Sequence, residues 1–269
     1  MTTITVTTQA GLDAALAAHG TDRDAEIIIN ALEGVWLKVG ASVSASIIAT
    51  DSTSVTAYGS ASVTAHDSAR VIAFDAATVY AYDSAYVYAY GSTTVYSFGS
   101  ARVVAYGSAG VHAYESASVH AYESASVTAT GSASVTAYDS ARVVAFDSAG
   151  VTATDSAHVT AFDSARVVAY DSVRVYATDS ANVVAFGSVT GSVTDSARVV
   201  AYGSANVVAS GSATVSAYDS AGVYAFGSAL VTASGSSSVH AYDSASVHVT
   251  GSVLVTTDDS SNVRVTGSN

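Results

Sequence analysis

The chain has 269 residues, no cysteine, no proline and a formal net charge of −13. Without cysteine it cannot contain a disulfide or a thiolate metal site. With 22 acidic against 9 basic residues, it lacks the basic surface that direct nucleic-acid binding requires. No run of about 18 apolar residues predicts a membrane span, and the N-terminus does not resemble a signal peptide. We therefore expect no direct nucleic-acid binding and, by default, a cytoplasmic location.

Residues 1–50 differ from the rest of the chain and are predicted to form an N-terminal cap. An apolar pattern of helical period predicts a helix at about Gln9–His19, with Thr8 as its N-cap. Such a helix would cover the unpaired backbone and the apolar core of the first coil, which otherwise invite end-to-end polymerisation. Leu12 and Trp36 are expected to help seal that coil. Partner binding by this segment is the alternative.

From Asp51 to Thr266 the chain repeats every eight residues as Asp/Gly-Ser-Ala-x-Val-x-Ala-aromatic, without a slip. The small apolar residues at positions three, five and seven alternate with variable ones, which predicts one strand per octad with positions four and six facing outward. Asp or Gly at position one and Ser at position two predict a corner. Stacked octads can bury an apolar side that one octad cannot. The sequence therefore predicts an all-β protein, a parallel β-solenoid over 51–266, with 267–269 as a tail.

The number of octads in one coil is inferred from position eight. Identical residues occur there in 10 of 24 pairs three octads apart, against 7 of 25 pairs two octads apart. Because like side chains stack well in neighbouring rungs, this favours a three-sided coil that contains three octads. Packing favours the alternative, a two-sided coil that contains two octads, because Ala-Val-Ala would underfill a wide interior.

One octad, 187–194, has Gly191 in place of the central Val. A missing side chain inside a strand is typical of a bulge. We therefore expect a local bulge or kink in this octad.

No catalytic, cofactor or metal site is predicted. Ser, Asp and His recur throughout the chain, so apparent triads follow from composition alone, and the basic residues are too dispersed to line a cleft. Consecutive acids at position one could favour calcium, but Gly replaces Asp freely. His112 and His120 occupy position six of successive octads, which lie on different sides of a coil and so cannot share a metal. We expect that the protein is not an enzyme.

A candidate contact surface is formed by a dense group of tyrosines in the early octads. Those at positions four and six should face outward, and two at position eight lie close to them in sequence. Outward rings could stack on sugars or on another solenoid, although β-favouring surface residues need no partner. Rings at position eight are expected to be mostly buried or half-buried. The candidate residues are Tyr80, Tyr82, Tyr86, Tyr88, Tyr90 and Tyr96.

A cap followed by regular coils resembles the right-handed parallel β-helix proteins, a resemblance of fold that covers the whole chain. The octad at 131–138, Gly-Ser-Ala-Ser-Val-Thr-Ala-Tyr, is also similar to the Gly-Ser-Thr-x-Thr-Ala repeats of bacterial ice-nucleation proteins. That second resemblance implies ice binding. The outward Thr-x-Thr row of that family is absent, however, since Thr78 and Thr94 are followed by Tyr80 and Tyr96.

Regularity without a catalytic cluster predicts a non-enzymatic structural or interaction solenoid. It would act as a rigid scaffold or binding surface for a protein partner or for itself. An ice-binding protein is one alternative. The other is an acidic mimic of duplex DNA that binds a DNA-handling enzyme, as in the pentapeptide-repeat proteins, which are also solenoids.

Overall fold

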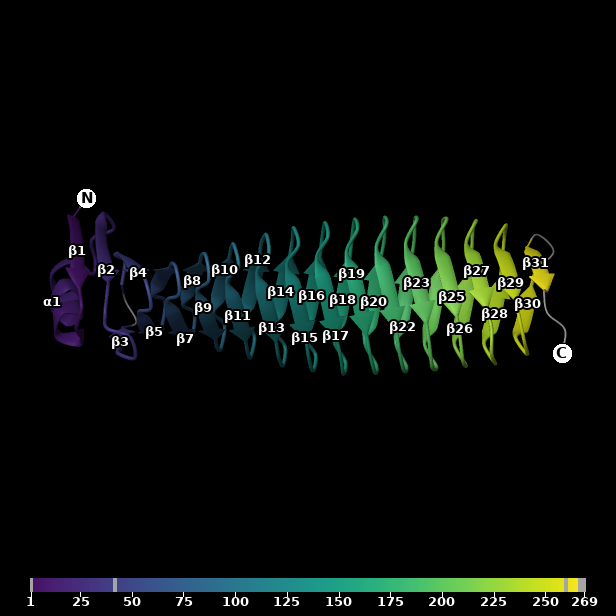
Figure 1. Ribbon diagram of the computed structural model, residues 1–269, viewed down its shortest axis with the longest axis horizontal. Coiled ribbons are helices and arrows are strands. Elements are labelled where there is room, and N and C mark those ends of the chain that lie inside the picture. The colour runs from purple at the N-terminus through teal and green to yellow at the C-terminus, as the bar shows by residue number, and fades with distance from the viewer. Residues whose placement is uncertain (1, 41–42, 259–260, 266–269) are drawn as a thin grey trace. The chain divides into compact units, whose positions relative to one another are not determined.

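The computed structural model describes residues 2–40, 43–258 and 261–265. The chain divides into two units, Met1–Val135 and Thr136–Asn269, and each is a parallel β-solenoid built from two sheets (Figure 1). In the part of the chain that the structure describes, no helix is both long and apolar enough to cross a membrane. The tail predicted at the C-terminus lies outside the described residues.

Unit 1 contains the helix α1 (Gln9–His19) and two sheets. Sheet A consists of β1 (Thr2–Val6), β2 (Ala25–Ile29), β4 (Ser46–Ala49), β6 (Ser62–Ala65), β8 (Thr78–Ala81), β10 (Thr94–Ser97), β12 (Gly110–Ala113) and β14 (Ser126–Ala129). Sheet B consists of β3 (Trp36–Val39), β5 (Ser54–Ala57), β7 (Arg70–Ala73), β9 (Tyr86–Ala89), β11 (Arg102–Ala105) and β13 (Ser118–Ala121). The strand β15 (Ser134–Ala137) contains the boundary between the units.

Unit 2 repeats this arrangement without a helix among its described residues. Its sheet A consists of β16 (Arg142–Ala145), β18 (His158–Ala161), β20 (Arg174–Ala177), β22 (Thr190–Val193), β24 (Asn206–Ala209), β26 (Gly222–Ala225), β28 (Ser238–Ala241) and β30 (Leu254–Thr257). Its sheet B consists of β17 (Gly150–Ala153), β19 (Arg166–Ala169), β21 (Asn182–Ala185), β23 (Arg198–Ala201), β25 (Thr214–Ala217), β27 (Leu230–Ala233), β29 (Ser246–Val249) and β31 (Asn262–Val265).

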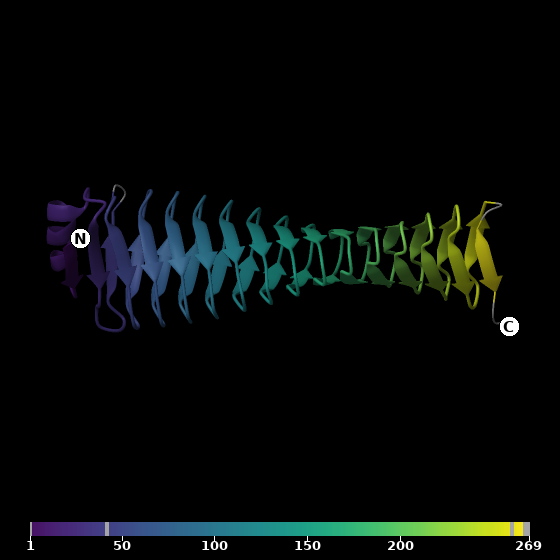
Figure 2. The same ribbon diagram turned by 90° about the horizontal axis from the view of Figure 1, so that it is seen from above.

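One turn of the solenoid contains two octads and therefore two strands. In sheet A, Thr94 of β10 pairs in parallel with Thr78 of β8 and with Gly110 of β12, and successive octads alternate between the two sheets (Figure 2). The predicted coil of three octads is therefore wrong, and a spacing of two octads is the one observed. The packing consideration holds, since Ala and Val can fill only a narrow interior. Identity at position eight is misleading, because unlike rings stack as well as identical ones.

The core lies between the two sheets and contains the side chains of positions three, five and seven. In the octad of β9, Ala85, Val87 and Ala89 are completely buried. The same three positions are buried in almost every described octad. Because these side chains are small and uniform, each turn can repeat the last one without adjustment, which the strict repeat of the sequence requires.

Each corner is a tight turn that begins at position eight. The Ala85 N–H donates to the Tyr82 carbonyl (3.0 Å), and the Ser84 N–H donates to the Asp67 carbonyl of the preceding turn (2.9 Å). Position one takes a left-handed backbone, with φ 59° at Asp83. Among the described residues every non-glycine with positive φ is an Asp or Glu at this position. This confirms the predicted corner and explains why Asp, Glu and Gly alternate there.

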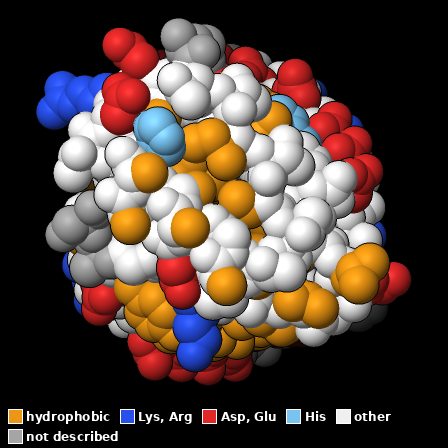
Figure 3. Space-filling view, turned by 90° about the vertical axis from the view of Figure 1, so that its left-hand side faces the viewer, with side chains coloured by type: hydrophobic (Ala, Val, Ile, Leu, Met, Phe, Trp, Pro, Cys, Tyr) orange, Lys and Arg blue, Asp and Glu red, His pale blue; other side chains and the backbone are white. Residues whose placement is uncertain are grey.

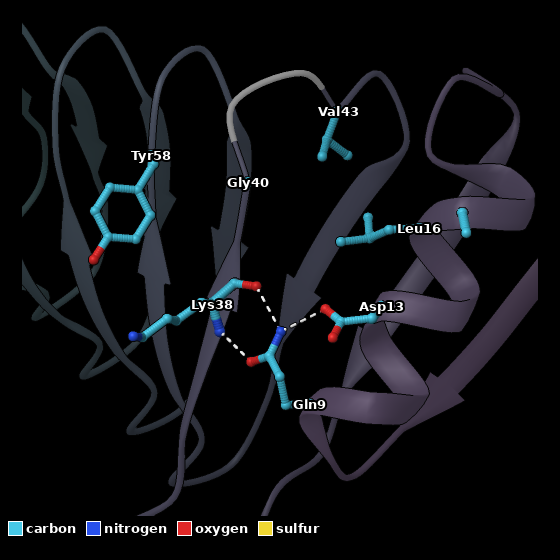
Figure 4. A pocket seen from close by; sticks show the side chains of 8 residues that line it. Gln9, Asp13, Leu16, Lys38, Gly40, Val43 and Tyr58 are labelled. Carbon is cyan, nitrogen blue, oxygen red and sulfur yellow. Dashed lines mark hydrogen bonds between the residues drawn. The ribbon is translucent and has the colours of Figure 1, made fainter.

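The helix α1 closes the first turn and is held by side-chain hydrogen bonds. Thr8 accepts from the Gly11 N–H at 3.2 Å, which confirms the predicted N-cap. The Gln9 carboxamide pairs with the first strand of sheet B: it accepts from the Lys38 N–H (2.7 Å) and donates to the Lys38 carbonyl (3.0 Å) (Figure 4). It thereby replaces a neighbouring strand at an otherwise unpaired edge. The same Nε2 donates to Asp13 at 2.7 Å.

Apolar side chains contribute unequally to this cap. Leu12 is fully buried, as predicted, whereas Trp36 remains 39% exposed and does not seal the first turn. Figure 3 looks onto this end of unit 1 and shows apolar side chains between uncharged polar atoms, with most acidic groups towards the rim of the view. Trp36 stays outside the core because it pairs with Ser54, which stands at position four, an outward position of the strand.

The predicted bulge at Gly191 is wrong. Gly191 pairs with Val175 and with Val207, each two octads away, so β22 keeps the register of its neighbours. The backbone hydrogen bonds of the ladder do not depend on the side chain, and the corners on either side fix the length of the strand. A hollow of about 400 Å³ lies on the outer side of sheet A at this octad, where the small outward residue Ser192 pairs with Tyr176 and with Val208.

Candidate aromatic contact surface

The carboxylates at position one are bonded to the backbone of the turn before them. The Gly59 N–H donates to Asp75 (3.0 Å), the Gly99 N–H to Glu115 (2.7 Å) and the Asp147 N–H to Asp163 (3.2 Å), each one turn further along the chain. The amides at positions two, three, four and eight find backbone partners at most of the corners. The acids therefore satisfy the one corner donor that lacks a backbone partner. The described residues contain no group of three or more metal-ligating side chains.

Rings at position eight form rows along the turns of unit 1, because each turn adds one ring above the last. Tyr90 stacks on Phe74 (centroids 5.1 Å apart, planes 13° apart) and on Tyr106 (5.1 Å, 5°). Burial raises the pKa of Tyr90, and the nearby Tyr106 adds to this. One row contains Tyr58, Phe74, Tyr90, Tyr106 and Tyr122, and the other contains His66, Tyr82, Phe98 and Tyr114.

Stacking leaves the rings of these rows half-buried, with their edges towards solvent. Each inner ring has a neighbour on both faces. Sugars bind to the faces of aromatic rings, so the inner members of a row cannot serve as sugar platforms. Among the described rings of its row, Tyr58 stands at one end: it stacks on Phe74 and is 37% exposed. It lines a hollow of about 620 Å³ next to α1 (Figure 4).

The outer side of sheet A in unit 1 carries a third row at position six. Tyr96 stacks on Tyr80 (5.1 Å, 10°) and on His112 (4.9 Å, 10°). None of the outward residues from β4 to β14 is Asp, Glu, Lys or Arg, and we call this surface the uncharged face. It consists of Ser46, Ile48, Ser62, Thr64, Thr78, Tyr80, Thr94, Tyr96, Gly110, His112, Ser126 and Thr128.

The outer side of sheet B in unit 1 is different, because its position-six row is interrupted. Val104 pairs with Tyr88 on one side and with His120 on the other. Next to it, Tyr86 and Tyr88 of β9 contact each other at a centroid distance of 5.0 Å, with planes 48° apart. A side-chain hydrogen bond with Tyr88 raises the pKa of Tyr86, burial adds to this effect, and the charge of Arg102 opposes it.

The interruption at Val104 forms a hollow of about 450 Å³ on the outer side of sheet B. Val104 itself is 9% exposed, whereas Arg102 and His120 are exposed. The hollow combines an aromatic wall, a guanidinium, an imidazole and several hydroxyls. Its lining consists of Tyr86, Ser100, Arg102, Val103, Val104, Ser116, Ser118 and His120.

The structure does not bring the six predicted tyrosines into one patch. Tyr80 and Tyr96 share the uncharged face, while Tyr86 and Tyr88 lie on sheet B. The remaining two lie in separate position-eight rows, Tyr82 after a strand of sheet A and Tyr90 after a strand of sheet B. His112 and His120 lie in different sheets, as the sequence predicts.

Sequence reasoning missed His112, Arg102 and His120 as neighbours of the tyrosines. His112 follows Tyr96 by two octads, and Arg102 follows Tyr86 by two octads. Reading the outward positions at this spacing would have found both. The signal was present in the sequence but was obscured by the expected coil of three octads.

On sheet A of unit 2 the outward rings form shorter rows, and the rings are more exposed than those of unit 1. Tyr176 and Tyr224 are 44% and 42% exposed, and Tyr224 stacks on His240 at 4.7 Å. Arginines stand at position four on both sheets of this unit, for example Arg142 and Arg166. On sheet A of unit 2, β16 and β20 carry Arg142 and Arg174. The outward residues from β22 to β30 are again uncharged, but this shorter stretch has one ring stack, Tyr224–His240, in place of the row Tyr80–Tyr96–His112.

Comparisons with protein-family models, with curated proteins and with solved structures found no match for this chain.

Proposed function

We propose that the protein is a non-enzymatic structural solenoid that associates side by side with copies of itself through the uncharged face. The observation that carries the proposal is this surface, in which six strands of unit 1 present only uncharged side chains and the imidazole of His112 around the Tyr80–Tyr96 stack. A flat surface without ionised carboxylates or ammonium groups loses little solvation energy when it is covered.

A second copy is the occupant that fits best, because the spacing is shared. Every row on this face repeats once per turn, about every 4.8 Å. Another copy carries rows with the same repeat, so ring edges and threonines of two copies can remain in register along the whole contact. None of the outward residues of this face is an acid, so carboxylates do not meet across it.

The proposed association is weak. Six strands of four residues give a face on the order of 400 Å² per copy, about half of what a stable interface buries on each partner. Like net charge on the two copies, −13 each, opposes contact at low ionic strength. Association should therefore need concentrations up to about 1 mM and should strengthen as salt screens the repulsion.

Sedimentation velocity of the full chain at increasing concentration and salt tests the proposal. The informative variant carries Tyr80→Ser and Tyr96→Ser, since Ser stands at the same octad position at Ser216. The control carries Tyr176→Ser, at the same position on sheet A of unit 2, on a strand that also carries Arg174. We expect association that the first variant weakens about tenfold or more and that the control retains. A chain that stays monomeric throughout, or an association that salt abolishes, contradicts the proposal.

A second candidate function, mimicry of duplex DNA towards a DNA-handling enzyme, is favoured by the placement of the acids. Fifteen acids among the described residues stand at position one of the corners, where those one turn apart form rows of carboxylates. In unit 2 the longest uninterrupted row consists of Asp147, Asp163, Asp179 and Asp195. Such rows concentrate negative potential along lines on the surface.

Inhibition of a topoisomerase by the chain, in competition with duplex DNA, tests this candidate. Asn retains an oxygen for the corner amide and tolerates positive φ, so Asp→Asn changes along the row remove charge with little change of fold. We expect inhibition that the Asn variant loses and that decreases with salt. No competition at low salt excludes the candidate.

Ice binding, the remaining alternative, has weaker support. Thr78 and Thr94 are adjacent in one column of sheet A, but Ser62 and Gly110 flank them. An ice-binding array needs a longer row of matched groups. Absence of thermal hysteresis at millimolar concentration, about 1 mM, would remove this alternative.

A further inference from the structure

We infer that the hollow on sheet B of unit 1 binds a flat aromatic carboxylate, with its ring above Val104 and its carboxylate on Arg102. The inference does not depend on the proposed self-association, because the hollow lies on sheet B and the uncharged face belongs to sheet A. Its volume of about 450 Å³ falls within the range of about 300–1,000 Å³ that is typical of small-ligand sites.

The place for the ring follows from comparing the two position-six columns of unit 1. On sheet A, Tyr80, Tyr96 and His112 stand one turn apart and stack continuously. On sheet B the corresponding column has Tyr88 and His120 with Val104 between them. The backbone spacing is the same, so the second column has room for one ring where the first column has Tyr96.

The neighbouring rings are in position to receive a guest. His120 is exposed, whereas His112, which stacks on Tyr96, is half-buried. On the other side Tyr86 lines the hollow, and its ring contacts the ring of Tyr88 at a centroid distance of 5.0 Å. A flat ring in the hollow would contact the ring of Tyr86 on one side and the imidazole of His120 on the other.

The charge of the ligand follows from Arg102. This guanidinium lines the hollow, and within the described residues it forms no ion pair with a carboxylate. The nearest corner acid in the sequence, Glu115, accepts the Gly99 N–H at 2.7 Å. An arginine fork binds a carboxylate through two parallel hydrogen bonds, and the Ser118 hydroxyl at the same octad position supplies a further donor.

A ligand of this size should bind weakly. For 2-naphthoate the usual affinity per heavy atom corresponds to a dissociation constant of about 1 mM. Two comparison probes separate the contributions: 2-naphthamide has the ring without the charge, and cyclohexanecarboxylate has the charge without the aromatic ring. The wild-type chain should bind both at least about tenfold more weakly than 2-naphthoate.

The experiment is an NMR titration of the full chain that follows the ligand signals and the ring protons of His120. Arg102→Gln should weaken 2-naphthoate binding about tenfold or more, while Arg70→Gln, at the same octad position on β7, should not. Val104→Tyr should abolish binding because its ring fills the gap. Val184→Tyr, at the same octad position on sheet B of unit 2, is the control, and circular dichroism verifies that each variant folds.

Three results would overturn the inference. The first is no saturable binding of 2-naphthoate up to about 10 mM. The second is that the variants Arg102→Gln and Val104→Tyr, tested separately, both bind 2-naphthoate as well as the wild-type chain does. The third is equal affinity for cyclohexanecarboxylate, which would remove the aromatic part. If Val104→Tyr fails to fold, Arg102→Gln and the two comparison probes still test whether the hollow binds an aromatic carboxylate. None of these results bears on self-association, which is measured without ligand and on sheet A.

Discussion

The two position-six columns of unit 1 have the same backbone and different contents. On sheet A the column Tyr80–Tyr96–His112 is a continuous stack of rings. On sheet B the column of Tyr88 and His120 is interrupted by Val104, and a hollow takes the place of the missing ring. Beneath both columns the residues at position five are valines with almost no exposed surface.

This difference separates what the repeat specifies from what it leaves free. Inward positions determine the turn, and because they scarcely vary, both sheets are built alike. Outward positions pack only against outward residues of the same turn and the adjacent turns, so a single residue there decides whether a column is closed or open. In a solenoid each residue contacts its own turn and the two adjacent ones, so such a choice stays local. Predictions about the two columns can therefore be tested by single substitutions.

The largest effect is expected in the core, where the two columns should behave alike. Val95 of sheet A and Val103 of sheet B are both completely buried. Replacing either with Ala should lower the free energy of unfolding by about 2 kcal/mol, because apolar contacts are lost and a small cavity remains. Urea denaturation measures both. A difference between the two variants of more than about 1 kcal/mol would mean that the sheets are not equivalent inside.

The next largest effect is a loss of stability that should differ between the two columns. Tyr96 has a ring on each side, whereas Tyr88 contacts only the ring of Tyr86. Each ring pair contributes about 0.5–1.5 kcal/mol beyond the area it buries. Tyr96→Ala should therefore destabilise the chain by about 1 kcal/mol more than Tyr88→Ala. Equal losses in urea denaturation would show that stacking along the column adds nothing.

A smaller effect of opposite sign is expected when the open column is closed. Val104→Tyr places a ring between Tyr88 and His120 and should stabilise unit 1 by about 0.5–1 kcal/mol. The ring protons of His120 should shift upfield, because they come under the current of the new ring. Val184→Tyr, which lies between valines of sheet B in unit 2, should produce neither change. Destabilisation by Val104→Tyr would indicate that the hollow is too narrow for a ring.

Much of the fold was predictable because the sequence constrains it redundantly. The alternation of Ala85, Val87 and Ala89 with variable residues predicted the strand, and Asp at position one predicted a corner with positive φ, as at Asp83. The helix Gln9–His19 followed from its apolar period and its cap. Each of these depends on residues close together in the chain, where spacing alone determines geometry.

The coil size depends on contacts between turns, and there the sequence was ambiguous. Stacking does not require identical rings, since Tyr58 stacks on Phe74 and His66 stacks on Tyr82. Identity at position eight was thus a poor measure of adjacency. Without the spacing of two octads, Val104 could not be recognised as a gap between Tyr88 and His120. The candidate tyrosines could be found from the sequence, but their distribution over two sheets and two rows could not.

The smallest effect concerns the hydrogen-bonded tyrosines at the edge of the open column. The side-chain hydrogen bond with Tyr88 is the largest cause that raises the pKa of Tyr86 above its ordinary value of 10.0. The folded chain therefore holds this proton more tightly than the unfolded chain does. The resulting stabilisation is present below the unfolded pKa and is lost as the pH rises through the folded pKa. Tyr88→Phe should lower the pKa of Tyr86, so that the loss of stability becomes smaller and is complete at a lower pH.

NMR signals of the Tyr86 ring, followed through an alkaline titration, measure this change directly, because the chain has 17 tyrosines whose absorbances overlap. Tyr80→Phe, in the closed column, is the matched control and should leave Tyr86 as it is. Tyr90 provides an internal reference, because burial is the largest cause of its raised pKa and Tyr88 only a minor one. If Tyr88→Phe left the titration of Tyr86 unchanged, the hydrogen bond would not restrain Tyr86, and the wall of the hollow would be as mobile as any exposed side chain.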